Sequence, residues 1–115
     1  MPDSSFRPDP VAAQYARGGS SVVVARGELD VDTVPLLAQA LERAAAAAPV
    51  VVLDVGGVTF ADSTTLNLLL RTHRATTLRI AAPQTQLLHL LEVTGADHVL
   101  RLYPSTDDAC AAAAS

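Results

Sequence analysis

Three hydroxyl side chains stand in a row where a strand-like run gives way to a leucine-rich segment. The stretch VTFADSTTLN, residues 58–67, places Ser63, Thr64 and Thr65 directly after Asp62. An Asp or Ser at a helix start accepts hydrogen bonds from backbone N–H groups two or three residues on, so Asp62 or Ser63 is suited to cap a helix. One cap needs only one such group, which leaves hydroxyls over in the first turn. A phosphate there would be tolerated, because free amides and the helix dipole favour negative charge, so the spare hydroxyls are candidate phosphorylation sites.

The histidines do not supply a catalytic base or a metal site for these hydroxyls. His73 follows Thr64 by nine residues in the same expected helix, which separates them by roughly 13 Å along the axis. A general base must lie within hydrogen-bond reach of the nucleophile, so His73 cannot activate Thr64 from that helix. His89 and His98 show no metal-ligand spacing with it.

The carboxylates and glycines also lack a catalytic arrangement. Glu28, Asp30 and Asp32 recur at every second position, and we expect them to cap and charge the start of a helix rather than to form a site. The pair Gly56-Gly57 is too short for a phosphate-binding loop, and neither a P-loop nor a dinucleotide-binding motif is present. The sequence therefore predicts a protein that is not an enzyme and that uses no cofactor or metal.

Composition limits the chain to a few classes of protein. Its 115 residues favour one domain, and its core must be aliphatic because 50% of residues are hydrophobic but only 3% are aromatic. The net charge is −4 and the eight Lys and Arg residues do not cluster, so we expect no nucleic-acid partner. A single cysteine, Cys110, excludes an intrachain disulfide. No signal peptide or apolar run of roughly 18 residues is present. These features predict a cytoplasmic protein without membrane insertion.

Apolar periodicity and turn residues predict nine elements in the order β-β-α-β-α-β-α-β-α. Residues 1–10, polar and with three prolines, are expected to be a flexible leader, followed by one domain over residues 11–115. Gly18-Gly19, both able to take positive φ, predict a hairpin turn. The predicted strands cover about residues 11–17, 22–28, 50–55, 77–81 and 98–103, and the predicted helices lie within about residues 30–49, 64–74, 83–95 and 104–115.

Individual residues mark the expected element ends. Asp32 or Thr33 can cap the first helix, and Gly95 can end the third. Ser105 can cap the last helix. After the strand 50–55, Gly56-Gly57 is expected to turn the chain. That strand is apolar on both faces, as in a strand covered on both sides, so the sequence predicts an α/β fold with an N-terminal hairpin followed by parallel strands in one mixed sheet.

Several sequence motifs, taken in their order along the chain, resemble the STAS domain family, in particular bacterial anti-sigma factor antagonists. The resemblance runs from about residue 11 to residue 114 and is carried by RGELDVDT, VVLDVGGVTFADSTTLN, RIAAP and LLEVTGADHVLRLYPSTDDA. In that family an Asp-Ser-Ser/Thr motif stands at the start of the second helix, and the third residue of the motif is phosphorylated. Asp62 matches the acid, Ser63 the first hydroxyl and Thr64 the phosphate acceptor, with Ser63 as second choice, while Asp30 matches an acid that lies near the phosphorylation site in the fold.

The resemblance implies an interaction protein. The unphosphorylated protein would bind an anti-sigma factor kinase and so release a sigma factor. Phosphorylation would end binding, and a phosphatase would reset it. The implied partner-binding residues are Asp30, Asp62, Ser63, Thr64, Thr65 and Asn67, and the protein is expected to be a monomer or a weak dimer.

Two features depart from the family pattern. Thr65 stands where family members usually have Gly, so a β-branched side chain would add bulk beside the acceptor. The second helix is also expected to be about one turn or more shorter than in the family. An alternative therefore stays open: a STAS domain that binds constitutively as a scaffold subunit, for example beside a transporter ATPase, without a phosphorylation switch.

Overall fold

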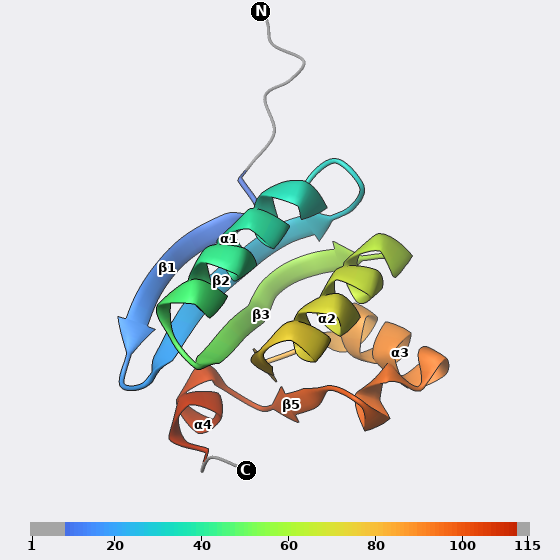
Figure 1. Cartoon of the computed structure of the whole chain (residues 1–115). Coiled ribbons are helices and arrows are strands. Elements are labelled where there is room, and N and C mark those ends of the chain that lie inside the picture. The colour runs from blue at the N-terminus through green and yellow to red at the C-terminus, as the bar shows by residue number, and fades with distance from the viewer. Residues whose placement is uncertain (1–8, 113–115) are drawn as a thin grey trace, which may run out of the picture.

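The computed structural model describes residues 9–112 as a five-stranded sheet with four α-helices (Figure 1). The expected order of elements is confirmed, with one added 3₁₀ turn, η1 (Ala96–His98). The strands are β1 (Val11–Arg17), β2 (Ser20–Leu29), β3 (Val50–Ala61), β4 (Thr77–Ala81) and β5 (Arg101–Tyr103), and the helices are α1 (Val34–Ala47), α2 (Ser63–Ala75), α3 (Thr85–Thr94) and α4 (Thr106–Ala111).

The sheet is mixed, as predicted. Its strand order is β1-β2-β3-β4-β5. β1 and β2 form an antiparallel hairpin, and all later pairs are parallel. Only Gly18 of the hairpin turn has a positive φ, at 58°, so the expectation of two left-handed glycines is wrong for Gly19. The parallel strands bring the carboxyl ends of β2 and β3 to the same edge, where the hydroxyl cluster follows β3.

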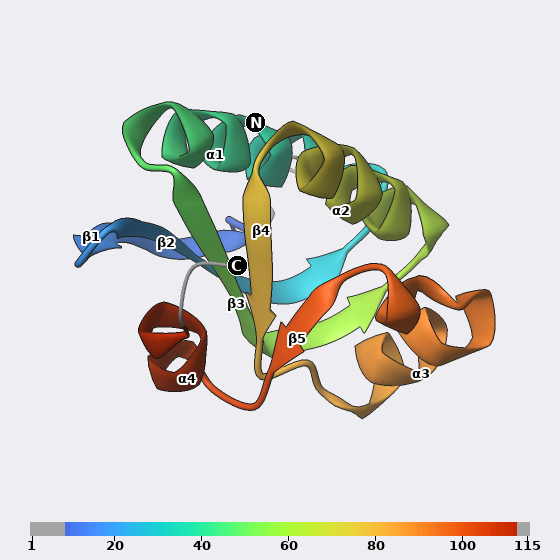
Figure 2. The same ribbon diagram turned by 60° about the horizontal axis from the view of Figure 1, so that its bottom comes forward.

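Helices cover the two faces of the sheet unequally. In Figure 2, α1 and α2 lie together above the sheet, and α4 lies below it. The larger core lies between the sheet and the α1–α2 layer and contains fully buried leucines such as Leu37, Leu53 and Leu69. The smaller core, under α4, is formed by Val22, Val52, Ala81 and Ala109. The α1–α2 layer is therefore packed on the sheet by a larger apolar core than α4 is.

The turn that leads into α1 is held by Asp30, one of the three acids expected at the start of this helix. The Asp30 carboxylate accepts hydrogen bonds from the backbone N–H of Asp32 at 3.0 Å and of Thr33 at 3.2 Å. Thr33 is the N-cap by position, but its hydroxyl donates to the Glu28 carbonyl at 2.9 Å and makes no capping bond. Thr33 thus occupies the predicted N-cap position, but no side chain caps the helix, and Asp30 instead holds the preceding turn.

The Gly56-Gly57 pair does not turn the chain. β3 continues through it to Ala61, and the pairing of β3 with β2 shifts register twice, between Val24 and Arg26 and between Gly27 and Glu28. Such bulges bend a strand while pairing continues. A Cβ on Gly56 would lie 3.2 Å from Asp54 Oδ1, so the bend also leaves little room there. The bent strand carries the chain to the start of α2.

Polar contacts fasten α4 under the sheet. The Ser105 hydroxyl accepts from the Asp108 N–H at 3.0 Å, which confirms the predicted cap. The buried Arg79 guanidinium donates to the carbonyls of Ala109 at 2.8 Å and Ala112 at 3.2 Å, at the carboxyl end of α4. At the helix start, a hydrogen bond to Asp107 raises the pKa of Arg17.

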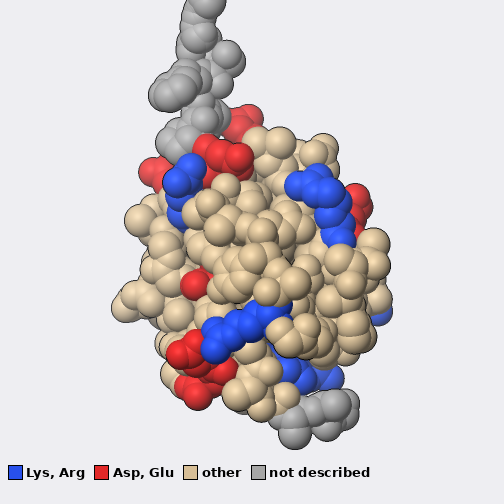
Figure 3. All heavy atoms as spheres, turned by 90° about the vertical axis from the view of Figure 1, so that its left-hand side faces the viewer, with Lys and Arg blue, Asp and Glu red and all other residues tan. Residues whose placement is uncertain are grey.

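Several expectations concern the chain ends and the surface. Most of the predicted leader, and the last three residues of the predicted final helix, lie outside the described residues. In the described part of the predicted leader, the Pro10 carbonyl accepts a hydrogen bond from the Arg26 N–H at 2.9 Å. Across residues 9–112, none of the helices combines the length and hydrophobicity that crossing a bilayer requires. Figure 3 shows the side of β1 as mainly uncharged, with small groups of both signs.

Candidate functional site

The site is built around the first turn of α2, which starts directly after β3. Asp62 is the N-cap, and its Oδ1 accepts from the backbone N–H of Thr64 at 3.0 Å and of Thr65 at 3.3 Å. The Asp62 carbonyl accepts from the Leu66 N–H at 3.1 Å. The two bonds to Oδ1 satisfy two of the N–H groups that lack an intrahelical acceptor at the start of α2. The cap is therefore Asp62 and not Ser63.

Two of the three hydroxyls are left over by this cap. Ser63 is exposed and Thr64 is half-buried. Within residues 9–112, neither hydroxyl takes part in a hydrogen bond. Ser63 and Thr64 are therefore the hydroxyls at this turn that a modifying enzyme could reach without breaking an internal bond.

Thr65 has a different role from its neighbours. Its side chain is fully buried, and its hydroxyl donates to the Leu29 carbonyl at the end of β2, at 3.0 Å. The side chain of Thr65 faces the core, so it adds no bulk at the surface beside Thr64. The partner contact expected of Thr65 stays a prediction. It instead ties the start of α2 to β2 and positions the residues before it.

Asp30 reaches the same edge of the sheet as Asp62. Leu29 pairs with Ala61 in the register of β2 and β3, so the two acids that follow these residues leave adjacent strand ends. The Asp30 carboxylate is engaged with the amides of its own turn. Asp62 thus caps α2 and Asp30 holds the turn before α1, at neighbouring strand ends.

The side-chain charges around the first turn of α2 disfavour an added anion, whereas the helix dipole favours one. The basic residues of α2 are Arg71, His73 and Arg74, all in its second half. A phosphate on Thr64, with a charge near −2, would therefore lie beside the Asp62 carboxylate, and the first turn of α2 contains no cationic side chain to offset it. Modification would make this surface strongly negative.

Four further side chains around the starts of α1 and α2 are exposed to solvent. Asn67 is exposed one turn after Thr64. Three apolar residues were not singled out from the sequence: Val31 is 68% exposed, Leu36 49% and Phe60 43%. Leu36 had a recognisable signal, because it lies off the Val34–Leu37–Leu41 stripe that faces the core. The exposure of Val31 and Phe60 had no signal in the sequence, because the alternation of apolar and polar residues is interrupted near both.

The family of the chain follows from comparison with known proteins. Residues 13–102 match the family model described as Mlab, STAS domain. The chain belongs to the STAS domain family. No curated protein sequence matches it with statistical significance.

Solved structures place this STAS domain beside anti-sigma factor antagonists. An anti-sigma factor antagonist from Mycobacterium paratuberculosis is 32% identical, with a TM-score of 0.80, over 90% of this chain and 93% of that one. This STAS protein therefore resembles anti-sigma factor antagonists, as the sequence predicted.

Two more distant structures share the fold. A candidate anti-sigma factor antagonist from Thermotoga maritima has a TM-score of 0.75 at 13% identity, over 84% of this chain and 89% of that one. The unphosphorylated anti-sigma factor antagonist SpoIIAA has a TM-score of 0.64 at 17% identity, over 84% of this chain and 90% of that one. Together they confirm the predicted STAS-like α/β fold.

Proposed function

We propose that this STAS protein is an anti-sigma factor antagonist whose binding to a kinase-type anti-sigma factor is switched off by phosphorylation of Thr64. The observation that carries the proposal is the division of roles at the start of α2. Asp62 caps the helix, Thr65 is buried, and the Thr64 hydroxyl remains free at the position that matches the family's acceptor. The similarity to an antagonist of known structure supports the same function.

The physical mechanism of the switch is electrostatic. The unmodified turn presents neutral hydroxyls and the exposed Asn67 to the anti-sigma factor. Phosphorylation of Thr64 adds a charge near −2 beside Asp62 and Asp30, and like charges placed within an interface cost several kcal/mol of binding free energy. The fold itself tolerates the phosphate, because the helix dipole favours an anion at its N-terminus. The switch therefore changes the surface and leaves the fold intact.

The direct test is phosphate transfer. Each purified anti-sigma factor kinase of the source organism is incubated with the protein and ATP, and modified residues are mapped by mass spectrometry. We expect phosphate on Thr64, its loss in Thr64→Ala, and its retention in Ser63→Ala. Phosphate on Ser63 alone would move the acceptor by one residue, and the absence of phosphate from both would contradict the switch.

Binding supplies the second readout. We expect Thr64→Glu to weaken binding of the unphosphorylated protein to its kinase by about tenfold or more, which corresponds to roughly 1.4 kcal/mol, while the melting temperature changes little. A matched control is Thr64→Gln, which has similar size without the charge. Equal binding by the Glu and Gln variants would show that charge does not operate the switch.

A second candidate function is constitutive binding as a STAS subunit, for example of a transporter ATPase. The observation that favours it is the matched family model, whose description names Mlab. In this case the surface around Thr64 would bind its partner without modification. The two functions differ in one measurement: a constitutive subunit keeps its partner affinity in both Thr64→Ala and Thr64→Glu.

A further inference from the structure

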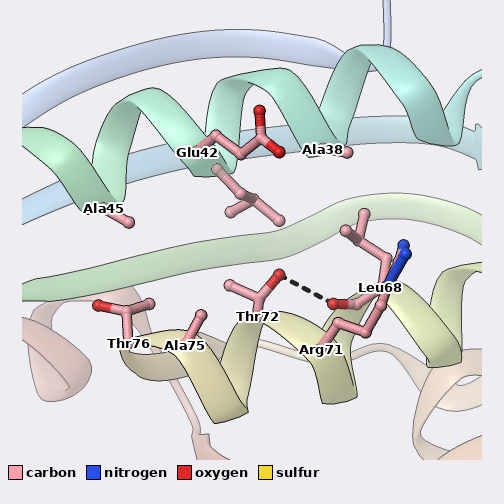
Figure 4. Close-up of a pocket in the computed structure, with 9 residues that line it drawn as sticks. Ala38, Glu42, Ala45, Leu68, Arg71, Thr72, Ala75 and Thr76 are labelled. Atoms are coloured by element: carbon pink, nitrogen blue, oxygen red, sulfur yellow. Dashed lines mark hydrogen bonds between the residues drawn. The ribbon is translucent and has the colours of Figure 1, made fainter.

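A groove separates the outer surfaces of α1 and α2 (Figure 4). Its volume is about 300 Å³. Its walls and floor are lined by Ala38, Leu41 and Ala45 of α1 and by Leu68, Thr72 and Ala75 of α2.

The groove is mainly apolar, and the side chains of Thr72 and Thr76 supply the hydroxyls that line it. The Thr72 hydroxyl donates to the Leu68 carbonyl at 2.8 Å, within its own helix, as the dashed line in Figure 4 shows. Ala38 and Ala45 are too small to reach the opposite helix, so the buried Leu41 and Leu68 form a floor below them. An apolar hollow at the surface favours insertion of an apolar side chain.

Two opposite charges flank the groove. Glu42 lines it from α1 and Arg71 from α2 (Figure 4). Both residues are exposed, and neither forms an ion pair or hydrogen bond with any other residue in the described range 9–112. The groove thus offers one free acid on one wall and one free base on the other. This arrangement is complementary to a segment that carries a base on one side and an acid on the other.

The groove continues the surface that contains Thr64. Leu68, Arg71 and Ala75 follow Thr64 by four, seven and eleven residues, and residues at this spacing share one face of a helix. Thr64 therefore lies one turn before the first groove residue of α2. A partner that covers Thr64 can extend along the same face into the groove.

We propose that this groove docks an amphipathic helix of the anti-sigma factor, which inserts one bulky aliphatic side chain between α1 and α2. The inserted residue is flanked by a basic side chain facing Glu42 and an acidic side chain facing Arg71. Helices commonly bind in this way, by placing apolar anchors in a groove. The inference rests on the proposed function for the identity of the partner, but it assigns a second contact that is separate from Thr64.

The test compares paired substitutions inside and outside the groove. Ala45→Met fills the groove, whereas Ala46→Met adds the same side chain at the adjacent exposed position outside it. Arg71→Glu reverses the charge of the groove wall, whereas Arg74→Glu reverses an exposed charge of α2 outside it. Binding to each purified anti-sigma factor kinase of the source organism is measured by calorimetry, and folding of each variant is verified by its thermal melt.

We expect Ala45→Met and Arg71→Glu each to weaken kinase binding by about tenfold, and Ala46→Met and Arg74→Glu to change it less than about twofold. Unchanged binding by both groove variants, with binding still reduced in Thr64→Glu, would overturn the groove and leave the proposed function standing. Reduced binding by the groove variants with no effect of Thr64→Glu would support the groove and overturn the switch. Absence of binding by every kinase would overturn both.

A small-molecule ligand is the competing occupant. If a small molecule occupies the groove, Ala45→Met would leave kinase binding unchanged. NMR titration of the protein with small apolar acids would then shift the resonances of Leu68 and Ala75 in the wild type but not in Ala45→Met. That result would overturn the docking of a helix.

Discussion

The four polar residues at the start of α2 carry three different roles. Asp62 caps the helix, Thr65 anchors it to β2, and Ser63 and Thr64 keep their hydroxyls free. The roles differ because a helix turn directs successive side chains about 100° apart. Substitutions at these neighbouring positions should therefore separate stability from binding.

Asp62→Ala should lower the free energy of unfolding by about 1 kcal/mol, because the N–H groups of Thr64 and Thr65 lose their acceptor. The loss is measured by urea denaturation. Ser63→Ala is the matched control and should change stability by less than about 0.5 kcal/mol. Equal effects of the two substitutions would show that Asp62 is not the energetic cap.

Thr65→Val should destabilise the protein by about 1–3 kcal/mol, because it preserves shape but leaves the Leu29 carbonyl without its donor. Thr65→Ser retains the hydroxyl and should lose less. The two variants are compared by thermal and urea unfolding. If valine were as stable as threonine, the bond between α2 and β2 would contribute nothing.

α4 depends on the sheet more than any other helix does. It has six residues, which is far below the length at which an isolated helix is stable. It is held by a small apolar cluster, by the donors of Arg79, and by hydrogen bonds from Thr106 to Asp54 and from Arg17 to Asp107. Detachment of α4 should therefore be possible without loss of the α1–α2 layer.

Arg79→Met should loosen α4, because methionine fills similar space but cannot donate to the Ala109 and Ala112 carbonyls. Cys110 lies in α4 and is half-buried, so its thiol reports on this motion. We expect its reaction with a thiol reagent to accelerate severalfold. Arg17→Met removes only an exposed ion pair and should have little effect. Equal rates in wild type and Arg79→Met would refute the role of Arg79.

The whole fold is stabilised mainly from the side of α1 and α2. That face holds most of the large buried side chains, including Leu53 at the centre of the sheet. The opposite face relies on smaller residues under α4. The proposed binding surfaces therefore sit on the more firmly packed layer, which keeps them in a fixed geometry.

Leu53→Ala should lower the free energy of unfolding by about 2–5 kcal/mol, since it removes apolar atoms and leaves a cavity in the larger core. Phe60→Ala, at an exposed position, should cost less than about 0.5 kcal/mol. Chemical denaturation measures both. A small loss at Leu53 would mean that the sheet is not supported by this core.

Much of the fold was accessible from sequence because its signals are local. The Val34–Leu37–Leu41 stripe gave α1 its buried face, and Gly95 marked the end of α3 in the left-handed conformation. Gly56-Gly57 was misread as a turn, because glycine serves both turns and bulges and only the pairing of β3 with β2 distinguishes them.

The sequence by itself determined the order of elements, the hairpin and a helix cap at either Asp62 or Ser63, since each depends on residues within a few positions of one another; the structure selected Asp62. Only the tertiary structure decided the burial of Thr65, whose acceptor on Leu29 is 36 residues away, and the groove between α1 and α2. These features arise where elements distant in sequence meet. Local propensity and periodicity carry no information about the side chain that will lie opposite.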